Sequence, residues 1–413
     1  MSLGDCVTSC QSCGSSQLLN VVSLGDMPAV NRLEATSSFL EQEKRFPTEL
    51  AICAVCSLAQ LKFIAPRSEV FPDDYPYTSG TTKALHRNFE GLYEIVSLLT
   101  PLDGDEFIID IGSNDGTLLS KFQKFGHKVL GIEPTGASAL ARASGIPTEK
   151  LFFSRSAGAA LVKRFGPAKV VCCTNCLAHV PDVGDFLGGV TDLLDSDGIF
   201  VSESHYFFAL IKDLQFDTIY HEHLRYYSVR SLQMLFSSCG LDVFHVQRIP
   251  THGGSIRVFA CLAGRRPILN SVHELLESEP KGPDLQGELD AFQAKVSAVR
   301  GQFNELISPI IENGATIVGI GAPSRSAILV NFFSVSRETL NYIAEAEGSR
   351  KIGKFLPGTN IQIVEETRVY EEQPEYALIL AWHLATEIAT SMRAKGFSGS
   401  FLVPLPVPTV LDI

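Results

Sequence analysis

The 413-residue sequence contains no apolar run near the ~18 residues that a membrane-spanning helix needs. Its opening stretch, Met1–Asp5, has neither the basic region nor the apolar core of a secretory signal. Basic residues are also few, because 34 Lys and Arg face 46 Asp and Glu, a net charge of −12. Nucleic acids and anionic membranes attract basic surfaces, so neither is an expected partner. We expect a cytoplasmic protein that binds a small molecule.

Low-complexity segments and short-period repeats are missing too, and a composition of 45% hydrophobic and 19% charged residues excludes global disorder. A typical domain has roughly 100–200 residues, so this chain is long enough for more than one core. Changes in pattern predict three domains. They are a cysteine-bearing domain over 1–70, a central domain over 71–300 and a C-terminal domain over 301–413.

The second and third domains alternate strand-like with helix-like segments, which favours α/β folds with parallel, doubly wound sheets. A long helix is expected over Asp284–Ile311, between two groups of strands. The strand candidates are Phe107–Ile111, Lys128–Ile132, Lys169–Cys173, Gly198–Ser202, the antiparallel pair Leu241–Gln247 and Ser255–Leu262, and then Ala315–Ile320, Leu340–Ala344, Tyr376–Leu380 and Ser400–Val403. We predict two Rossmann-like sheets, the second smaller than the first.

Five of the ten cysteines lie within the first 56 residues, and four of these form two Cys-x-x-Cys pairs, Cys10 with Cys13 and Cys53 with Cys56. Each pair can turn two thiolates toward one ion, and four thiolates make the closed tetrahedral site typical of structural zinc. The 39 residues between the pairs exceed the ~15–20 of a common zinc ribbon, so an insertion is expected there. Unrelated buried or free thiols are the alternative.

A cofactor loop is indicated at the end of the first central strand, where Asp110-Ile-Gly-Ser-Asn-Asp-Gly-Thr-Leu118 leads into a helix. Gly112 lets the backbone approach a ligand, and Asn114 and Asp115 can bond its polar atoms. Glu133 ends the next strand, where a carboxylate accepts hydrogen bonds from ribose hydroxyls. Gly-x-Gly-x-x-Gly is absent, so a dinucleotide fits poorly, and the pattern resembles that of class I methyltransferases that bind S-adenosylmethionine. Asn175, after the third strand, is placed to meet the cofactor.

The densest group of acid–base side chains lies in Phe216–Ser228 and includes Tyr220, His221, Glu222 and His223. Histidine suits proton abstraction near neutral pH, a carboxylate can orient it, and a tyrosine hydroxyl can donate to a developing oxyanion. His-Glu-His is not the metal-binding His-Glu-x-x-His. His179 is a further candidate on the substrate side. The alternative is a polar helix start with surface histidines.

Three loops add weaker candidates, each of which could equally be an ordinary turn. Asp74–Gly80 contains Tyr77, which we place with the catalytic group. His252-Gly-Gly-Ser-Ile-Arg257 could present His252 and Arg257 to an anion. Gly319–Ser326 opens a helix whose backbone amides, with Ser324 and Arg325, suit a phosphate or diphosphate.

Taken together, these motifs resemble nucleotide-sugar C-methyltransferases of the TDP-sugar 3-C-methyltransferase type, and they follow in order through nearly the whole chain. The ordered set is specific, although no single member is. It comprises the split cysteine pairs, Tyr-Pro-Tyr-Thr-Ser, Asp-Ile-Gly-Ser-Asn-Asp-Gly-Thr-Leu-Leu, Asn175 with His179, Tyr-His-Glu-His, His-Gly-Gly-Ser-x-Arg, Gly-Ala-Pro-Ser-Arg and Leu356-Pro-Gly-Thr-Asn-Ile361.

The resemblance implies a zinc-binding domain, an S-adenosylmethionine-binding domain and a C-terminal domain that helps to hold a sugar nucleotide. It implies His223 as the base that generates an enolate, with Tyr220, Glu222 and His179 around it and His221 near the substrate. Some positions depart from the family pattern: Arg325 stands where Lys is usual, Ala344-Glu345-Ala346 replaces an expected acidic residue, and Leu380-Ala-Trp-His383 replaces Leu-Pro-Trp-Asn.

The sequence thus predicts S-adenosylmethionine-dependent C-methylation of a nucleotide-linked keto-deoxysugar in unusual-sugar biosynthesis, for an antibiotic or a surface polysaccharide. A small-molecule O- or N-methyltransferase and a non-catalytic zinc-containing binding protein are the alternatives. A monomer is compatible with the sequence, which does not fix the oligomeric state.

Overall fold

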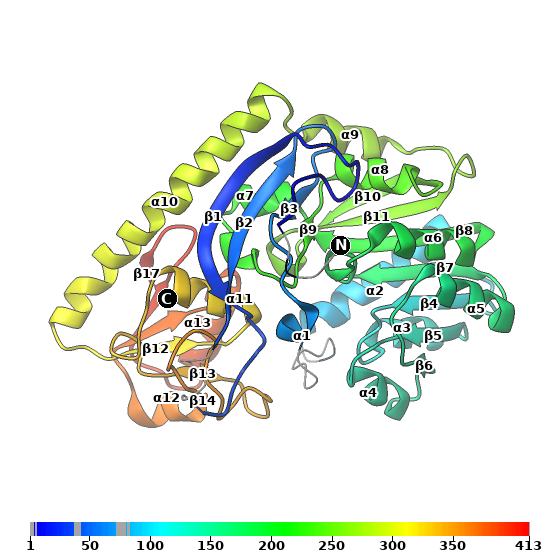
Figure 1. Ribbon diagram of the computed structural model, residues 1–413. Helices are drawn as coiled ribbons and strands as arrows, with labels where there is room; N and C mark the ends of the chain where they lie inside the picture. The colour runs from blue at the N-terminus through cyan, green and yellow to red at the C-terminus, as the bar shows by residue number, and fades with distance from the viewer. Residues whose placement is uncertain (1–3, 5, 37–42, 72–79, 81–82, 413) are drawn as a thin grey trace.

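The computed structural model describes residues 4, 6–36, 43–71, 80 and 83–412, and its strands form three sheets. Figure 1 shows two lobes, with the long strands β1 and β2 running between them and the C-terminal sheet in the lobe opposite the central sheet. The prediction of an N-terminal four-cysteine unit followed by two Rossmann-like sheets is confirmed.

The central sheet has seven strands in the order β10-β11-β8-β7-β4-β5-β6, all parallel except β11, which is antiparallel to both neighbours. Its strands are β4 (Phe107–Ile111), β5 (Lys128–Ile132), β6 (Thr148–Glu149), β7 (Ala168–Thr174), β8 (Leu194–His205), β10 (Leu241–Ile249) and β11 (Ser255–Leu262). The middle strands are apolar runs because both of their faces are covered. The expected strands and the late antiparallel pair are therefore present.

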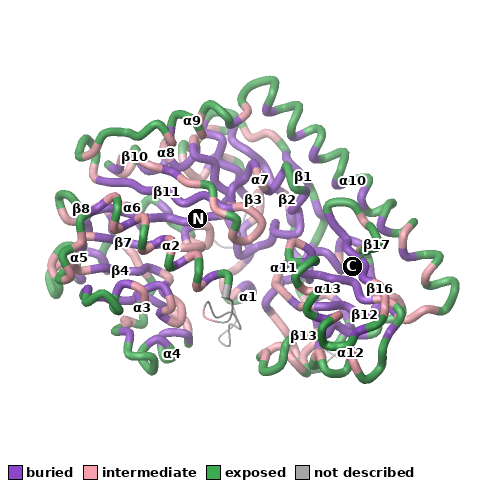
Figure 2. The backbone as a smooth tube through the Cα atoms, turned by 180° about the vertical axis from the view of Figure 1, so that it is seen from behind, coloured by how far each residue is buried: buried purple, intermediate pink, exposed green. Residues whose placement is uncertain are grey.

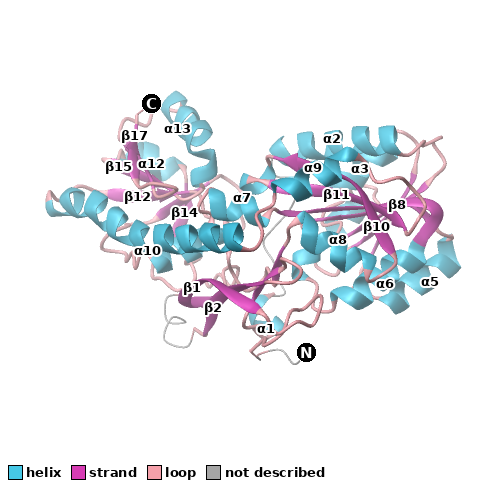
Figure 3. Cartoon of the chain, turned by 90° about the horizontal axis from the view of Figure 1, so that it is seen from above, coloured by secondary structure: helices cyan, strands magenta, loops and turns pink. Residues whose placement is uncertain are grey.

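Helices cover both faces of the central sheet, as Figure 3 shows from above. One face packs against α2 (Lys83–Leu99), α3 (Thr117–Gln123) and α4 (Ala137–Ala143); the other packs against α5 (Arg155–Phe165), α6 (Val183–Leu193) and α8 (Val229–Ser237). Adjacent residues of β4 pack on opposite faces of the sheet. Ile108 belongs to the core on the side of α2, α3 and α4, and Ile109 belongs to the core on the side of α5, α6 and α8. Side chains of a strand alternate between faces, so such a run needs two apolar layers.

The C-terminal sheet has six strands in the order β14-β13-β12-β15-β16-β17, all parallel except the edge strand β17. Its elements are β12 (Ile317–Ile320), α11 (Ser324–Phe332), β13 (Ile343–Glu345), β14 (Ile363–Glu365), α12 (Thr367–Glu372), β15 (Tyr376–Ile379), α13 (Ala385–Ala394), β16 (Ser400–Val403) and β17 (Thr409–Leu411). The expected strands at 315–320, 340–344, 376–380 and 400–403 overlap β12, β13, β15 and β16.

The N-terminal sheet has the order β1-β2-β3-β9, in which β1 (Leu18–Pro28), β2 (Arg45–Cys53) and β3 (Ala59–Leu61) are joined by β9 (Arg225–Tyr226) from the central part of the chain. The insertion between the cysteine pairs is thus an antiparallel pair of strands, β1 with β2. No pattern in the sequence indicated that the fourth strand would come from the segment directly after His223.

The predicted long helix is α10 (Pro283–Glu312), which runs along the outside of the molecule and exposes one side, as Figure 2 shows. Shorter helices are α1 (Arg67–Val70), α7 (Phe207–Lys212) and α9 (Asn270–Ser278), with single 3-10 turns η3 (Leu177–His179), η4 (Phe216–Thr218), η5 (Thr251–Gly253) and η6 (Trp382–Leu384). Within the described ranges, no helix combines the length and apolar character that crossing a membrane requires.

Two glycines allow α5 and α6 to pack closely. A Cβ added at Gly158 would lie 2.8 Å from the carbonyl oxygen of Gly189.

We expect Gly158→Val to lower the free energy of unfolding by roughly 1–3 kcal/mol, the usual cost of overpacking, measured as a lower urea midpoint. Gly287→Ala is the control: Gly287 lies in α10 and its added Cβ would meet no atom within 4 Å, so this change should leave the midpoint unchanged or raise it. Equal midpoints for Gly158→Val and wild type would contradict the packing argument.

Candidate active site and zinc centre

A cavity of about 1460 Å³ lies between the central and C-terminal sheets. It collects the carboxyl ends of β4, β5, β7 and β8 from one side and the carboxyl ends of β12 and β13 with η6 and α13 from the other. Ligands of open α/β sheets bind at the carboxyl ends of strands. Pockets for one small ligand usually enclose about 300–1,000 Å³, so this volume suits two ligands side by side.

The cofactor end of the cavity is formed by the loops after β4, β5 and β7. The buried Glu133 carboxylate accepts hydrogen bonds from the backbone N–H groups of Asn114, at 3.0 Å, and Thr135, at 2.8 Å. Gly112 has a φ of 78°, and a Cβ on it would lie 2.7 Å from Cys176 Sγ. A fixed carboxylate beside a backbone without a side chain is what an adenosine ribose requires, so these residues fit S-adenosylmethionine.

The structure separates the predicted cofactor residues into two groups. Gly112, Asn114, Glu133 and Asn175 line the cavity. Asp115 does not line it; its carboxylate accepts hydrogen bonds from the backbone N–H of Gly80 at 2.7 Å and from the Thr117 hydroxyl at 2.6 Å, at the start of α3. Asp115 therefore holds the loop in place.

Next to these loops lies Asp110, a buried carboxyl group in β4 whose Oδ1 has no hydrogen-bond partner within the described residues. Burial, with the nearby charges of Glu133 and Glu203, raises the pKa of Asp110 well above its usual value. An unpaired polar atom here is a further feature that a polar ligand would satisfy.

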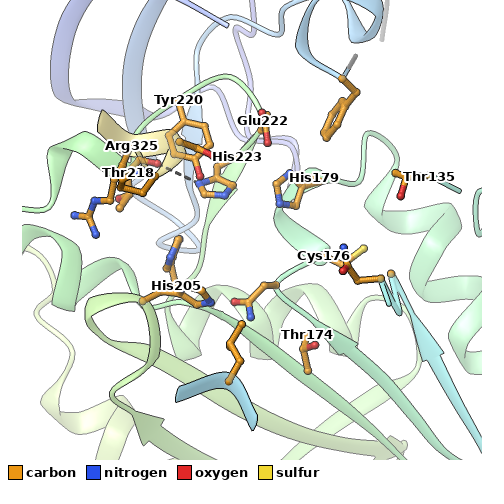
Figure 4. A pocket seen from close by; sticks show the side chains of 18 of the residues that line it. Thr135, Thr174, Cys176, His179, His205, Thr218, Tyr220, Glu222, His223 and Arg325 are labelled. Carbon is orange, nitrogen blue, oxygen red and sulfur yellow. Dashed lines mark hydrogen bonds between the residues drawn. The ribbon is translucent and has the colours of Figure 1, made fainter. Parts of the chain in front are cut away.

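The segment that follows η4 brings the predicted acid–base residues into the cavity. Thr218, Tyr220, Glu222 and His223 all line it, and Figure 4 shows them gathered opposite the loop that carries His179. His223 Nδ1 lies 3.1 Å from the carbonyl oxygen of Thr218. A carbonyl only accepts, so this bond places the proton on Nδ1 and leaves Nε2 with a lone pair. The Tyr220 ring lies over the imidazole, with centroids 4.2 Å apart.

Five histidines surround this part of the cavity: His179, His205, His223, His252 and His383. Ring centroids are 4.9 Å apart for His179 and His223, and 5.2 Å apart for His205 and His223. Burial lowers the pKa of His179 and His252 to about 4, and burial with the neighbouring imidazoles lowers the pKa of His223 well below its usual value. The cluster is therefore neutral at pH 7, so that His223 can accept a proton.

One buried amide joins all three parts of the chain at this site. Asn31, which follows β1, donates from Nδ2 to Glu222 at 2.6 Å and accepts from the Ser324 hydroxyl at 2.7 Å. Glu222 and Ser324 both line the cavity. The segment after β1 thereby orients Glu222, the carboxylate predicted for the catalytic group, and no pattern in the sequence indicated this role for Asn31.

The predicted substrate residues lie in different places. His252, Ser324 and Arg325 line the cavity, whereas His221 and Arg257 do not. Arg257 is buried in β11, donating to Glu203 at 2.5 Å and to Asn88 at 2.9 Å.

His221 is held in the N-terminal sheet instead. Its Nε2 lies 3.1 Å from the Thr48 hydroxyl and 3.3 Å from the carbonyl oxygen of Pro47, and its ring meets the edge of Phe46. The remaining candidate, Tyr77, lies outside the described residues.

Several cavity residues were missed by the sequence reasoning. His205 ends β8, where the rule about strand ends could have found it, and His383 lies in η6. Lys351 follows β13 in a segment without pattern, is half-buried, and donates to the carbonyl oxygen of Ala322 at 2.5 Å. Glu345 corrects one expectation. It ends β13, so an acidic residue is present where a replacement was expected from the sequence. Its carboxylate accepts a hydrogen bond from the Ala322 N–H at 2.7 Å.

The four predicted cysteines form one cluster whose sulfur atoms all lie within 4.8 Å of one another. Cys10 Sγ is 3.4 Å from Cys56 Sγ, and Cys13 Sγ is 3.6 Å from Cys53 Sγ. With Zn–S bonds of ~2.3 Å, a tetrahedral ion separates its sulfurs by ~3.8 Å, so the cluster fits zinc. Four thiolates leave no open position, and the cavity lining includes none of these cysteines; the zinc is structural.

Comparison with known proteins identifies the family. Three family models match successive parts of the chain: a zinc binding domain over residues 10–71, a methyltransferase domain over 84–246 and a C-methyltransferase C-terminal domain over 250–406. C-methyltransferase NovU of Streptomyces niveus is 32% identical over 413 residues, covering 98% of this chain and 97% of the relative. This chain belongs to the C-methyltransferase family. It is an S-adenosylmethionine-dependent enzyme that methylates carbon, as the resemblance predicted.

Two solved structures resemble parts of this C-methyltransferase. Magnesium protoporphyrin IX methyltransferase of Synechocystis, with bound S-adenosylmethionine, is 12% identical and covers 43% of this chain and 79% of its own, with a TM-score of 0.34. The PH0226 protein of Pyrococcus horikoshii is 13% identical and covers 47% and 97%, with a TM-score of 0.36. The assignment to the family does not depend on them.

The zinc centre gives the first prediction for this site. Cys53→Ser removes one of four thiolates, so bound zinc should fall from about one ion per chain to near zero, measured by elemental analysis after gel filtration. Cys6→Ser is the matched control, because Cys6 is exposed and outside the cluster. Zinc retained by Cys53→Ser, or lost from Cys6→Ser, would show that the ligand set is wrong.

The buried histidines predict loss of stability in acid. An unfolded histidine titrates near ~6.5, whereas folded His252 titrates at about 4. Between these values the unfolded chain binds the extra proton, so this group stabilises the fold above pH 6.5 and ceases to do so as the pH falls toward 4. Between pH 7.5 and 5.5, His252→Gln should therefore lose roughly 1 kcal/mol less of its free energy of unfolding than wild type does, as read from urea midpoints. Parallel pH curves for variant and wild type would refute it.

Proposed function

We propose that this C-methyltransferase methylates a carbon next to the ketone of a nucleotide-linked keto-deoxysugar, in unusual-sugar biosynthesis. The observation that carries the proposal is the neutral His223, whose Nδ1 is bonded to the Thr218 carbonyl and whose Nε2 is free of a proton, in the same cavity as the cofactor loops. An acidic proton next to a ketone needs a base of this kind. The ordered motifs shared with nucleotide-sugar C-methyltransferases support the sugar nucleotide.

The cofactor is held by Gly112, Asn114, Glu133 and Asn175 in this proposal. When bound, S-adenosylmethionine supplies an electrophilic methyl carbon. His223 removes the proton next to the ketone and keeps it on Nε2, while the Thr218 carbonyl stabilises the resulting imidazolium through Nδ1–H. A carbonyl partner that fixes the tautomer in advance lowers the cost of proton transfer, because no group has to reorient.

The enolate oxygen that forms needs a hydrogen-bond donor. Tyr220 and His179 are the candidates, because the His223 ring lies next to both of their rings. His179 is neutral, and its Nδ1 has no partner among the described groups. A donor already aimed at a developing charge typically contributes about 3–4 kcal/mol to lowering a barrier. Glu222, oriented by Asn31, completes the polar wall of the cavity.

The sugar nucleotide contacts the C-terminal side of the cavity in this proposal. Ser324 and the N-terminus of α11 face it there, with Arg325, Lys351 and His252 nearby. Arg257 and His221 do not contact the substrate in this proposal. They support the residues around the cavity through their hydrogen bonds with Glu203 and Thr48. Zinc takes no chemical part, because its cluster is closed.

The test is a screen of nucleotide-linked 3-keto and 4-keto sugars with S-adenosylmethionine, which reads the product by mass and the methylated position by NMR. Wild-type enzyme should also exchange the proton next to the ketone with deuterated water. Transfer to a small-molecule oxygen or nitrogen, without exchange of any keto-sugar, would replace the proposal with the O- or N-methyltransferase alternative.

His223→Gln should slow that exchange by about 10²–10⁴-fold, the usual contribution of a general base, while calorimetry shows unchanged S-adenosylmethionine binding. His245→Gln is the matched control, since His245 lies in β10, bonded to Ser271 at 2.7 Å and away from the cavity. Exchange at the wild-type rate in His223→Gln would disprove the base assignment.

A further inference from the structure

Asp217, in η4, is a fully buried carboxylate held by two side chains of the C-terminal domain. Arg325 donates to it from Nε at 2.6 Å and from Nη2 at 2.5 Å, and Trp382 donates from Nε1 at 2.8 Å. The guanidinium also lies 5.0 Å from the Trp382 ring. A bidentate ion pair away from water has strong and specific geometry, so this contact fixes η4 against the C-terminal domain.

The residue after Asp217 supplies the carbonyl that holds the base. Thr218 accepts from His223 Nδ1 at 3.1 Å and from the Tyr226 hydroxyl at 2.8 Å. Figure 4 shows Arg325, Thr218 and His223 in succession along one side of the cavity. The direction of a backbone carbonyl is set by the peptide that carries it, and here that peptide, Thr218–Ile219, begins at the residue directly after Asp217, which is bonded to Arg325.

Aromatic packing holds the first residue of η4, Phe216, to the same domain. The ring of Phe216 lies 4.6 Å from that of Phe332, in α11, the helix that Arg325 enters at its first turn. The first two residues of the three-residue turn are therefore held by α11, and the third, Thr218, directs its carbonyl at the imidazole.

We propose that Asp217, clamped by Arg325 and Trp382, is a positioning residue that aims the Thr218 carbonyl at His223 and so selects the Nδ1–H tautomer. The inference rests on the proposed role of His223 as base. It assigns Arg325 to the base and not to a phosphate, because Nε and Nη2 both bind Asp217, and Nη1 lies 3.3 Å from His383 Nδ1. Docking of the C-terminal domain thereby completes the base in the central domain.

The two roles of Arg325 predict different kinetics. As a positioning residue, Arg325→Met should lower kcat for deuterium exchange by about 10–100-fold, since misplacement by ~1 Å can cost 10²-fold, with an unchanged KM. Arg325→Lys, which keeps one charged donor, and Trp382→Phe, which loses only the indole N–H, should each retain more activity than Arg325→Met. A phosphate ligand would instead raise KM at unchanged kcat.

A spectroscopic readout tests the inference without substrate. In protein labelled with ¹⁵N-histidine, the His223 signals, identified by their loss in His223→Gln, should report a single Nδ1–H tautomer. Arg325→Met and Trp382→Phe should show a mixture. Arg266→Met is the matched control: Arg266 lies over Phe244, 5.2 Å from the ring, and donates to the carbonyl oxygen of Leu99, away from the cavity. It should lower stability and leave the tautomer unchanged.

The outcomes separate cleanly. A single tautomer in both clamp variants, or a rise in KM alone, overturns the positioning role. A mixed tautomer in both, with the control unaffected, supports it. If wild-type enzyme exchanges no keto-sugar, the proposed function fails, while the tautomer signals still decide whether Asp217 positions the imidazole.

Discussion

The pairing of β3 with β9 is the contact on which the segment of the proposed base, His223, depends. Ala59 lies opposite Tyr226, and the Leu61 N–H donates to the carbonyl oxygen of Leu224 at 3.0 Å. The segment from Phe216 to Ser228 is buried and has little regular structure, so its backbone polar groups need partners elsewhere. The second cysteine pair of the zinc cluster ends at Cys56, three residues before β3 begins at Ala59. The predicted zinc site thus lies close along the chain to the strand that pairs with β9, directly after the proposed base.

Burial of uncharged polar groups governs the other side of the site. Five imidazoles and the Asp110 carboxyl line one cavity, and burial lowers the pKa of His205 and His383 and raises that of Asp110, so that their charged forms are disfavoured. A neutral imidazole is a competent proton acceptor, and low polarity strengthens any hydrogen bond to an enolate oxygen. Two buried ion pairs lie in the same region, Asp217 with Arg325 and Glu203 with Arg257.

Local patterns in the sequence predicted what is local in the structure. The apolar runs of β4, β5 and β7, the glycine loop that ends in Glu133, and the four cysteines were all found, because each depends on neighbours within one short element. The fourth strand of the N-terminal sheet was not found, since two residues carry no periodicity. Arg257 and Arg325 looked alike as anion ligands, and only the tertiary partners, Glu203 and Asp217, show that both are already paired. The role of Asn31 could not be predicted for the same reason, because it depends on hydrogen bonds with Glu222 and Ser324, two residues from distant parts of the chain.

The two parallel sheets repeat one arrangement across the cavity. In the central sheet, Glu133 directly follows the strand next to β4 and accepts from the Asn114 N–H; in the C-terminal sheet, Glu345 ends the strand next to β12 and accepts from the Ala322 N–H. Parallel strands direct their carboxyl ends to one edge, so two such sheets that face each other enclose two strand-end sites in one space. The proposed base, His223, lies on neither sheet. It lies on an irregular segment that contacts three separate parts of the chain, β3, Asn31 and α11.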